Sequence, residues 1–138
     1  MATKREPKQK LSRQERRDLD VEIQFIEGVV RRDPRYVEAL QILGDNYTRR
    51  GNFSKGRKVD EKLARLRPDD PLVHYNLACS YALTNQVARA VKSLEKAISL
   101  GYRDFRWLAK DPDLEKVRRH PSFKKIQAKL QSLRVKVR

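Results

Sequence analysis

The sequence repeats itself once at a separation of 34 residues, and this period constrains the fold more than any other feature. The residues that match at this separation are Pro34 and Pro68, Leu43 and Leu77, Gly44 and Ala78, Tyr47 and Tyr81, and Gly51 and Asn85. Between residues 71 and 100 the apolar residues recur at intervals of three and four on both sides of Asn85 and Gln86. Each period therefore predicts one hairpin of two packed antiparallel helices.

The matching residue types each have a physical reason. Gly44 and Ala78 are small, which lets the first helix of a hairpin approach the second closely. Tyr47 and Tyr81 offer large apolar area for the space between hairpins, together with a hydroxyl that can bind a partner. Pro68 ends the second helix, because the residue before a proline is disfavoured in the helical region.

This combination resembles the tetratricopeptide repeat family, whose 34-residue signature contains Leu-Gly/Ala, Tyr, a later Ala, an aromatic residue and a closing Pro. The resemblance extends from Val37 to Tyr102. It implies an all-α fold, a right-handed solenoid of antiparallel helical hairpins. His74, Gly56 and Asp60 replace a bulky apolar residue, an alanine and an aromatic residue of the signature, so we expect the repeat at 37–70 to be packed less tightly than the repeat at 71–102.

The segments on either side of the repeats predict helical caps. Ser12 to Glu15 match a capping box, and an apolar stripe follows up to Pro34, in the place of the second helix of a preceding repeat. Phe25 and Val29 lie beside that stripe. After Gly101 the template fades, and short apolar clusters predict helices that close the last hairpin. The final helix carries the stripe Phe123, Ile126, Leu130 and Leu133.

The predicted organisation is a basic tail followed by one helical domain. Residues 1–11 are expected to be disordered, because they are rich in lysine and poor in apolar side chains. Residues 12–138 are expected to form a single domain. Its parts are a capping helix at 12–34, repeats at 37–70 and 71–102, and a basic helical cap at 103–138.

Composition favours a chain outside membranes. The mean hydropathy is −0.84, and the longest uncharged run, from Pro71 to Ala88, contains several polar residues, so no segment is expected to span a bilayer. The N-terminal residues are charged and lack the apolar stretch of a secretory signal, so none is expected. Cys79 is the only cysteine, which excludes an intrachain disulfide. We therefore expect a cytoplasmic protein.

The positive charge is concentrated at the two ends of the chain. The formal net charge is +15, and residues 103–138 carry twelve Lys/Arg against four Asp/Glu. Residues 1–17 carry seven Lys/Arg against two Glu, whereas residues 18–102 are nearly neutral, with fourteen against twelve. The ends are therefore candidates for contact with an anionic partner.

The sequence contains no recognisable catalytic constellation. His74 and His120 are the only histidines, and with one cysteine they form no cluster with zinc-ligand spacing. No glycine-rich phosphate loop and no nucleophile motif occurs. We read His74 as a packing residue and His120 as a helix cap. The chain is therefore expected to be non-catalytic, with no metal and no cofactor.

The resemblance implies that binding takes place in the concave groove formed by the first helix of each repeat. In one branch of the family this groove holds acidic C-termini of chaperones through Lys, Asn, Asn, Lys and Arg. Only Asn76 matches that clamp here, so a two-carboxylate clamp is not expected, and Tyr75 with Leu72 and Leu83 favours an apolar or mixed peptide. Alternatively, the groove is too short for tight binding, or a terminal segment occupies it. The predicted groove residues are Glu38, Gln41, Ile42, Asp45, Arg49, Leu72, Tyr75, Asn76, Cys79 and Leu83.

Two functions remain after these exclusions. The first is a protein-interaction module or adaptor that binds a peptide or protein segment in the groove, with the basic ends favouring an acidic partner. The second is a nucleic-acid or ribosome-associated protein that binds through its basic termini. The sequence makes no prediction of oligomeric state. The predicted anionic contacts are Arg118, Arg119, Lys124, Lys125 and Lys129.

Overall fold

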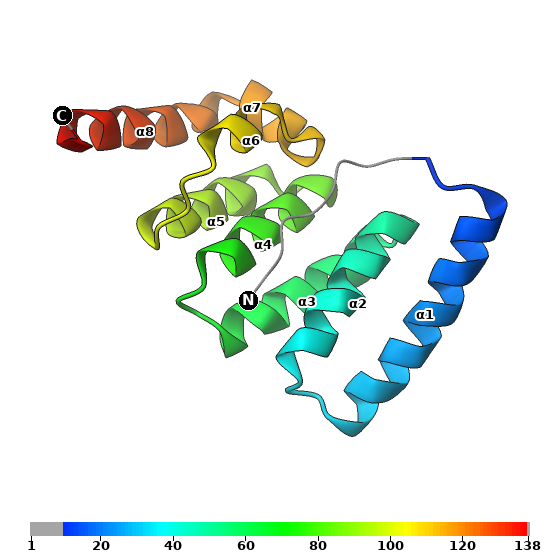
Figure 1. Cartoon of the computed structure of the whole chain (residues 1–138). Helices are drawn as coiled ribbons and strands as arrows, with labels where there is room; N and C mark the ends of the chain where they lie inside the picture. The colour runs from blue at the N-terminus through cyan, green and yellow to red at the C-terminus, as the bar shows by residue number, and fades with distance from the viewer. Residues whose placement is uncertain (1–9, 138) are drawn as a thin grey trace.

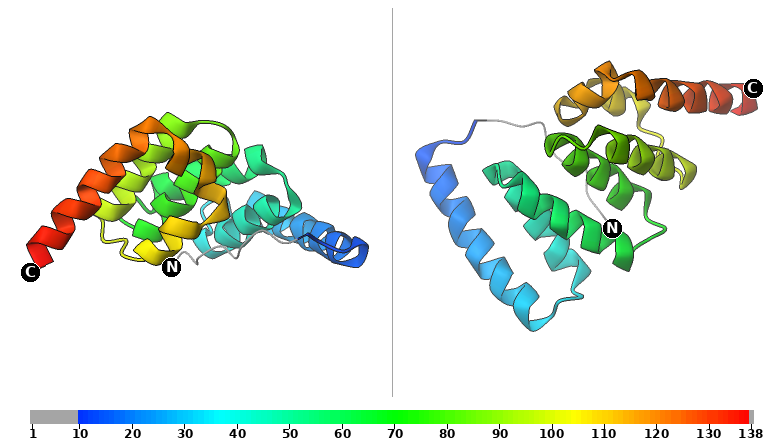
Figure 2. Two further views of the ribbon diagram at one scale, coloured as in Figure 1. Left: turned by 90° about the horizontal axis from the view of Figure 1, so that it is seen from above. Right: turned by 180° about the vertical axis from the view of Figure 1, so that it is seen from behind.

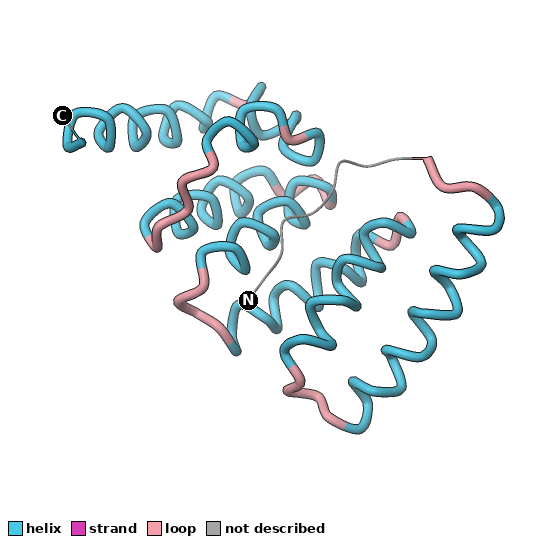
Figure 3. The backbone as a smooth tube through the Cα atoms, in the orientation of Figure 1, coloured by secondary structure: helices cyan, strands magenta, loops and turns pink. Residues whose placement is uncertain are grey.

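The computed structural model describes residues 10–137, and the described part contains helices and no strand (Figures 1 and 3). The fold is all-α. Most of the predicted disordered tail, residues 1–9, lies outside the described residues. The helices are α1 (Arg13–Arg32), α2 (Val37–Arg50), α3 (Phe53–Leu66), α4 (Pro71–Leu83), α5 (Val87–Ser99), α6 (Phe105–Lys110), α7 (Glu115–Arg119) and α8 (Lys124–Val137), with 3-10 turns η1 (Pro112–Leu114) and η2 (Pro121–Phe123).

The two predicted hairpins are present and stack on one another. Helices α2 and α3 form the first hairpin and α4 and α5 the second, and α3 packs directly against α4. Helix α1 packs against α2 at one end of the stack, and α8 lies against α5 at the other. Figure 1 shows α1 at one end of the stack and the helices α6, α7 and α8 at the other, and Figure 2 shows the same order from above and from behind.

Local sequence signals set the helix ends. Ser12 forms the predicted capping box with Glu15 at the start of α1. Gly51 ends α2 with φ of +90°, a left-handed conformation that strains residues with a Cβ. The Asp70 side chain accepts hydrogen bonds from the first amides of α4, beside Pro71 at the first turn.

Small residues hold the helices of each hairpin close together. In the second hairpin Ala78 and Ala90 are completely buried. In the first, a Cβ added to Gly56 would meet the hydroxyl oxygen of Thr48 at 2.9 Å. The glycine is therefore not a sign of loose packing in the first hairpin, because it allows a close approach of α3 to α2.

Asp60 also has a specific structural role. Its carboxylate is buried and accepts a hydrogen bond from the Ser80 hydroxyl at 2.5 Å. This bond joins α3 to α4, and so joins one hairpin to the next. The departure from an aromatic residue at this position replaces an apolar contact with a buried polar one.

A hydrogen bond recurs at both junctions between successive repeats. The Tyr47 hydroxyl donates to Glu27 of α1 at 2.5 Å, and the Tyr81 hydroxyl donates to Glu61 of α3 at 2.8 Å. The two tyrosines are 34 residues apart, and so are the two glutamates. Helix α1 therefore stands to α2 as α3 stands to α4, which makes α1 the second helix of a repeat.

The largest apolar cluster lies under the C-terminal helices. Leu108, Leu114, Val117 and Ile126 are fully buried there, against α4 and α5. His120 accepts a hydrogen bond from the amide of Ser122 and caps η2, as predicted. Across the described residues, no helix combines the length and apolar character needed to cross a membrane.

Candidate protein-binding surface

The predicted groove residues of α2 lie along a strip that the other described residues leave accessible. Glu38, Ile42 and Arg49 are exposed, and Gln41 and Asp45 are half-buried. They share one side of the helix because their spacing follows its period of about 3.6 residues. The opposite side of α2 packs against α1 and α3. The strip combines one apolar side chain with charges of both signs.

The predicted groove residues of α4 are covered, which corrects part of the prediction. Tyr75 and Cys79 are each only 1% exposed, and Asn76 is also buried. Leu72 and Leu83 are half-buried. A peptide cannot contact Tyr75 or Cys79 unless the covering segment moves. Within residues 10–137, the groove is therefore open along α2 and closed along α4.

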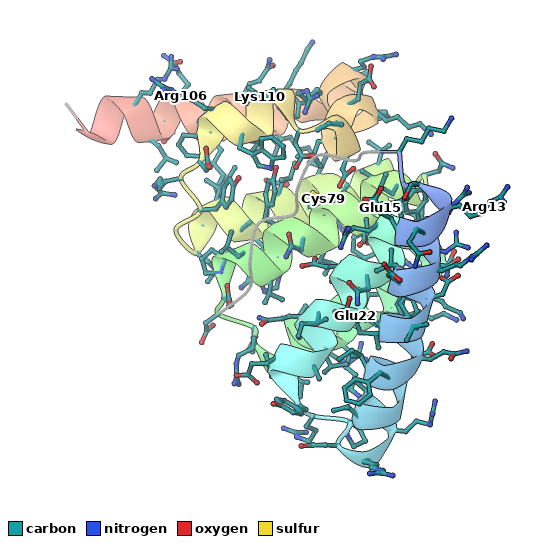
Figure 4. All side chains as sticks on the ribbon, turned by 45° about the vertical axis from the view of Figure 1, so that its right-hand side comes forward. Arg13, Glu15, Glu22, Cys79, Arg106 and Lys110 are labelled. Atoms are coloured by element: carbon teal, nitrogen blue, oxygen red, sulfur yellow. The ribbon has the colours of Figure 1, made fainter. Side chains whose placement is uncertain are left out.

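The C-terminal cap supplies the covering segment. The Tyr102 ring stacks on the Tyr75 ring, with centroids 4.3 Å apart and planes 5° from parallel. Asp111 accepts a hydrogen bond from the Tyr75 hydroxyl at 2.7 Å, and the Cys79 thiol lies 3.6 Å from the same oxygen. We call Tyr102 together with residues 111–114 the lid. Figure 4 shows Cys79 on α4, beneath the cap helices.

Asp111 also organises the lid itself. Its other carboxylate oxygen accepts from the amide of Asp113 at 3.0 Å and so caps η1. Cys79, Asp111 and Asp113 bring ligand-type atoms within 4.8 Å of one another. Because donors within the chain occupy both Asp111 oxygens, the arrangement acts as a hydrogen-bonded clasp between the cap and α4.

Burial of the tyrosines makes stability sensitive to alkaline pH. Burial raises the pKa of Tyr102 from 10 to about 12. The pKa of Tyr75 is also raised, chiefly by burial and further by the neighbouring Cys79 and Asp111. Between pH 10 and 12 the native state therefore keeps protons that the unfolded chain releases.

Unfolding free energy should consequently fall as pH rises above 10. Each such tyrosine contributes up to about 1.4 kcal/mol per pH unit in that interval. Urea denaturation at pH 9, 10 and 11 measures this slope. The Tyr102→Phe variant keeps the stacked ring and should show a shallower slope. An equal slope in the variant would contradict the assignment to Tyr102.

The predicted anionic contacts divide into structural and accessible groups. Arg118 is half-buried and donates to the carbonyl oxygens of Leu108 and Asp111 at 2.9 and 2.8 Å, so it fixes the cap instead of facing a partner. Arg119 is exposed and pairs with Glu115 one turn earlier. The prediction of an anionic contact at Arg118 is therefore corrected.

Accessible positive charge remains on both sides of the cap. Lys124 and Lys125 are exposed and Lys129 is half-buried. Arg106 and Lys110, which the sequence reasoning did not select, are exposed on α6 and point away from the body (Figure 4). Arg106 and Lys110 are four residues apart, about one helical turn, and this spacing could have indicated that they share one face of a helix.

Comparison with known proteins agrees with this geometry. A profile of the family described as "Tetratricopeptide repeat" matches residues 72–100, which contain nearly all of α4 and α5. The chain is a tetratricopeptide-like helical repeat protein. Its tetratricopeptide hairpin at 72–100 is the one whose first helix lies under the lid.

A curated relative shares part of this tetratricopeptide-like chain. A chloroplastic protein from Arabidopsis thaliana is 39% identical over 80 residues, which cover 51% of this chain and 24% of the relative. The chain thus spans about a quarter of the length of the curated relative it matches. No solved structure gave a significant match.

Proposed function

We propose that this chain is a non-catalytic adaptor that binds a segment of another protein along α2. The observation that carries the proposal is the accessible strip itself. Ile42 is 42% exposed between the charged Glu38 and Arg49, whereas the lid buries Tyr75 and Cys79 of α4. An apolar side chain flanked by opposite charges suits a peptide of mixed character.

The cap supports an acidic partner. Two of its four carboxylates serve as helix caps, Asp104 for α6 and Asp111 for η1. Residues 103–138 carry twelve Lys/Arg against four Asp/Glu, so the cap has a net positive charge. Such a surface accelerates encounter with an acidic protein, and the acceleration falls with added salt.

Site-specific photocrosslinking tests the proposal. A photoreactive phenylalanine analogue is placed at Ile42 and, as a matched control, at Gln131, an exposed residue of α8. We expect discrete protein adducts from position 42 in cells of the native host, with lower yield when Arg49→Glu is added. Adducts no different from those at position 131 would overturn the proposal.

A second candidate, binding of a nucleic-acid backbone, is favoured by a row of basic residues on α3 and α5. Two of them are held over tyrosine rings at equivalent places, Lys55 over Tyr47 at 5.6 Å and Arg89 over Tyr81 at 5.9 Å. The row consists of three pairs, each separated by 34 residues: Lys55 and Arg89, Lys58 and Lys92, and Lys62 and Lys96. All six residues are exposed except Lys62, which is half-buried.

Salt-dependent binding separates this candidate from the first. Fluorescence anisotropy with a labelled RNA would compare K58E/K92E with K124E/K125E. A larger loss in K58E/K92E, with a steep salt dependence in the parent, would support the row on α3 and α5. Absence of binding at low salt would remove this candidate and leave the crosslinking result unaffected.

A further inference from the structure

Helix α1 presents an apolar face that the described part of the chain does not cover. Val21 is 67% exposed and Phe25 is 69% exposed, more than any other large apolar side chain described. Leu19 and Ile23, on the opposite side of the same helix, are buried against α2. In Figures 1 and 2, α1 is the outermost helix at its end of the stack.

The repeat register explains which surface this is. Because α1 is a second helix, its residues correspond to those 34 and 68 positions later. Val29 is half-buried, whereas its counterparts Leu63 and Ala97 are buried. Phe25 is exposed, whereas its counterpart Ser93 is buried. The side of α1 that carries Phe25 and Val29 is therefore the side that, in a complete hairpin, packs against an antiparallel first helix. Val21 lies at the edge of this side, because its counterparts Lys55 and Arg89 are exposed.

The uncovered face of α1 has an acidic residue near one end and a basic residue at the other. Asp18 lies towards the N-terminal end of α1 and Arg32 is its last residue, and both are exposed. Val21, Phe25 and Gly28 lie between them, so that the face advances in steps of three, four, three and four residues. An antiparallel copy of the same helix would place each Asp18 beside an Arg32.

We propose that two copies of this chain associate through α1, antiparallel about a twofold axis near Phe25. In this register Asp18 lies opposite Arg32 of the second copy, and Val21 lies opposite Val29. Glu22 lies opposite Gly28, which leaves room for its longer side chain. The pairing is self-complementary, as a twofold interface requires, and it supplies each α1 with the antiparallel helix that its register lacks.

The interface consists of one helix from each copy, which is less area than a permanent dimer commonly buries. Association should therefore be reversible and depend on concentration. Sedimentation velocity of the full chain over a dilution series tests this. We expect the average mass to rise from 16.3 kDa towards twice that value as concentration increases.

Substitutions locate the interface. Phe25→Glu should abolish association, whereas Ile42→Glu, an equivalent change at an exposed apolar residue of α2, should not. Both side chains are exposed, and circular dichroism checks that each variant stays folded. A parent that remains monomeric throughout the series, or a dimer unaffected by Phe25→Glu, would overturn the proposal.

Charge exchange tests the register. D18R alone and R32D alone should each weaken self-association, because each places like charges opposite one another. An equimolar mixture of the two variants should recover it, because both cross-helix pairs become attractive in the heterodimer. Failure of the mixture to recover association would rule out the antiparallel register.

Discussion

Replacing Asp111 with alanine should lower the free energy of unfolding by about 2–4 kcal/mol. Asp111 is buried and accepts hydrogen bonds from the Tyr75 hydroxyl and from the first turn of η1. The substitution leaves the tyrosine hydroxyl buried without this acceptor and removes a helix cap. Urea denaturation followed by the fluorescence of Trp107, the only tryptophan, measures the loss.

Two comparisons separate these contributions. Asp104→Ala also removes a cap, since Asp104 accepts from the amide of Trp107, but it leaves the clasp to α4 intact. It should cost about 1 kcal/mol. Asp111→Asn keeps an acceptor and should lie between the two. If Asp111→Ala were no more damaging than Asp104→Ala, the clasp would contribute nothing to stability.

In the same variants, the reaction rate of the Cys79 thiol measures how often the lid opens. Cys79 is the only cysteine and is buried beneath the lid. Its rate of reaction with a thiol reagent should therefore increase in Asp111→Ala before global unfolding occurs. A rate that changes only in proportion to global stability would show that the lid does not open separately.

Removal of residues 121–138 should make the protein aggregate. Ile126 is fully buried, and Phe123, Leu130 and Leu133 pack against the same cluster. Burial of Ile126 alone contributes about 1.5–3 kcal/mol, and the deletion also exposes its apolar partners on α5 and the cap. Static light scattering and binding of an apolar dye measure the exposed surface.

A point substitution provides the matched test. Ile126→Asp keeps the chain length and introduces a charge into the same contact, so it should reproduce the defect. Ala128→Asp, at an exposed position of the same helix, is the control and should behave like the parent. A truncated chain that stays soluble, does not aggregate and keeps its melting temperature would show that α8 is an appendage.

The helices were predictable because their signals are local. The capping box at Ser12, the left-handed Gly51 and the Asp70-Pro71 start each act within a few residues, and the helix ends lie there. The repeat register was equally accessible, because the same side chains recur at one separation. The recurring hydrogen bonds of Tyr47 and Tyr81 are its structural counterpart.

From the sequence, covering of the groove by a terminal segment was only one of several alternatives, because the contacts of the lid are not local. Tyr75 and Asp111 are 36 residues apart, and their meeting depends on the path of several short turns. Arg118 was misassigned for a related reason. A run of basic residues suggests a solvated face, but the carbonyl oxygens that bind this guanidinium belong to the ends of other segments.

The exposure of Phe25 could not be predicted from the sequence either. The sequence placed it beside an apolar stripe, and the stripe itself is buried where α2 covers it. Whether the flank of such a stripe is covered depends on the neighbouring helix, which residue periodicity does not specify. Only the structure shows that α1 has a neighbour on one side and none of the described residues on the other.

The closed lid lowers the apparent affinity of any ligand for the α4 face. Because Tyr102 and Asp111 already contact Tyr75, a ligand for that face can bind only the fraction of molecules in which the lid is open. The apparent dissociation constant is the intrinsic one divided by that fraction, so each 1.4 kcal/mol that favours closure weakens apparent binding by about tenfold. Substitutions in the cap, far along the chain from α4, would therefore tune affinity there without touching the ligand.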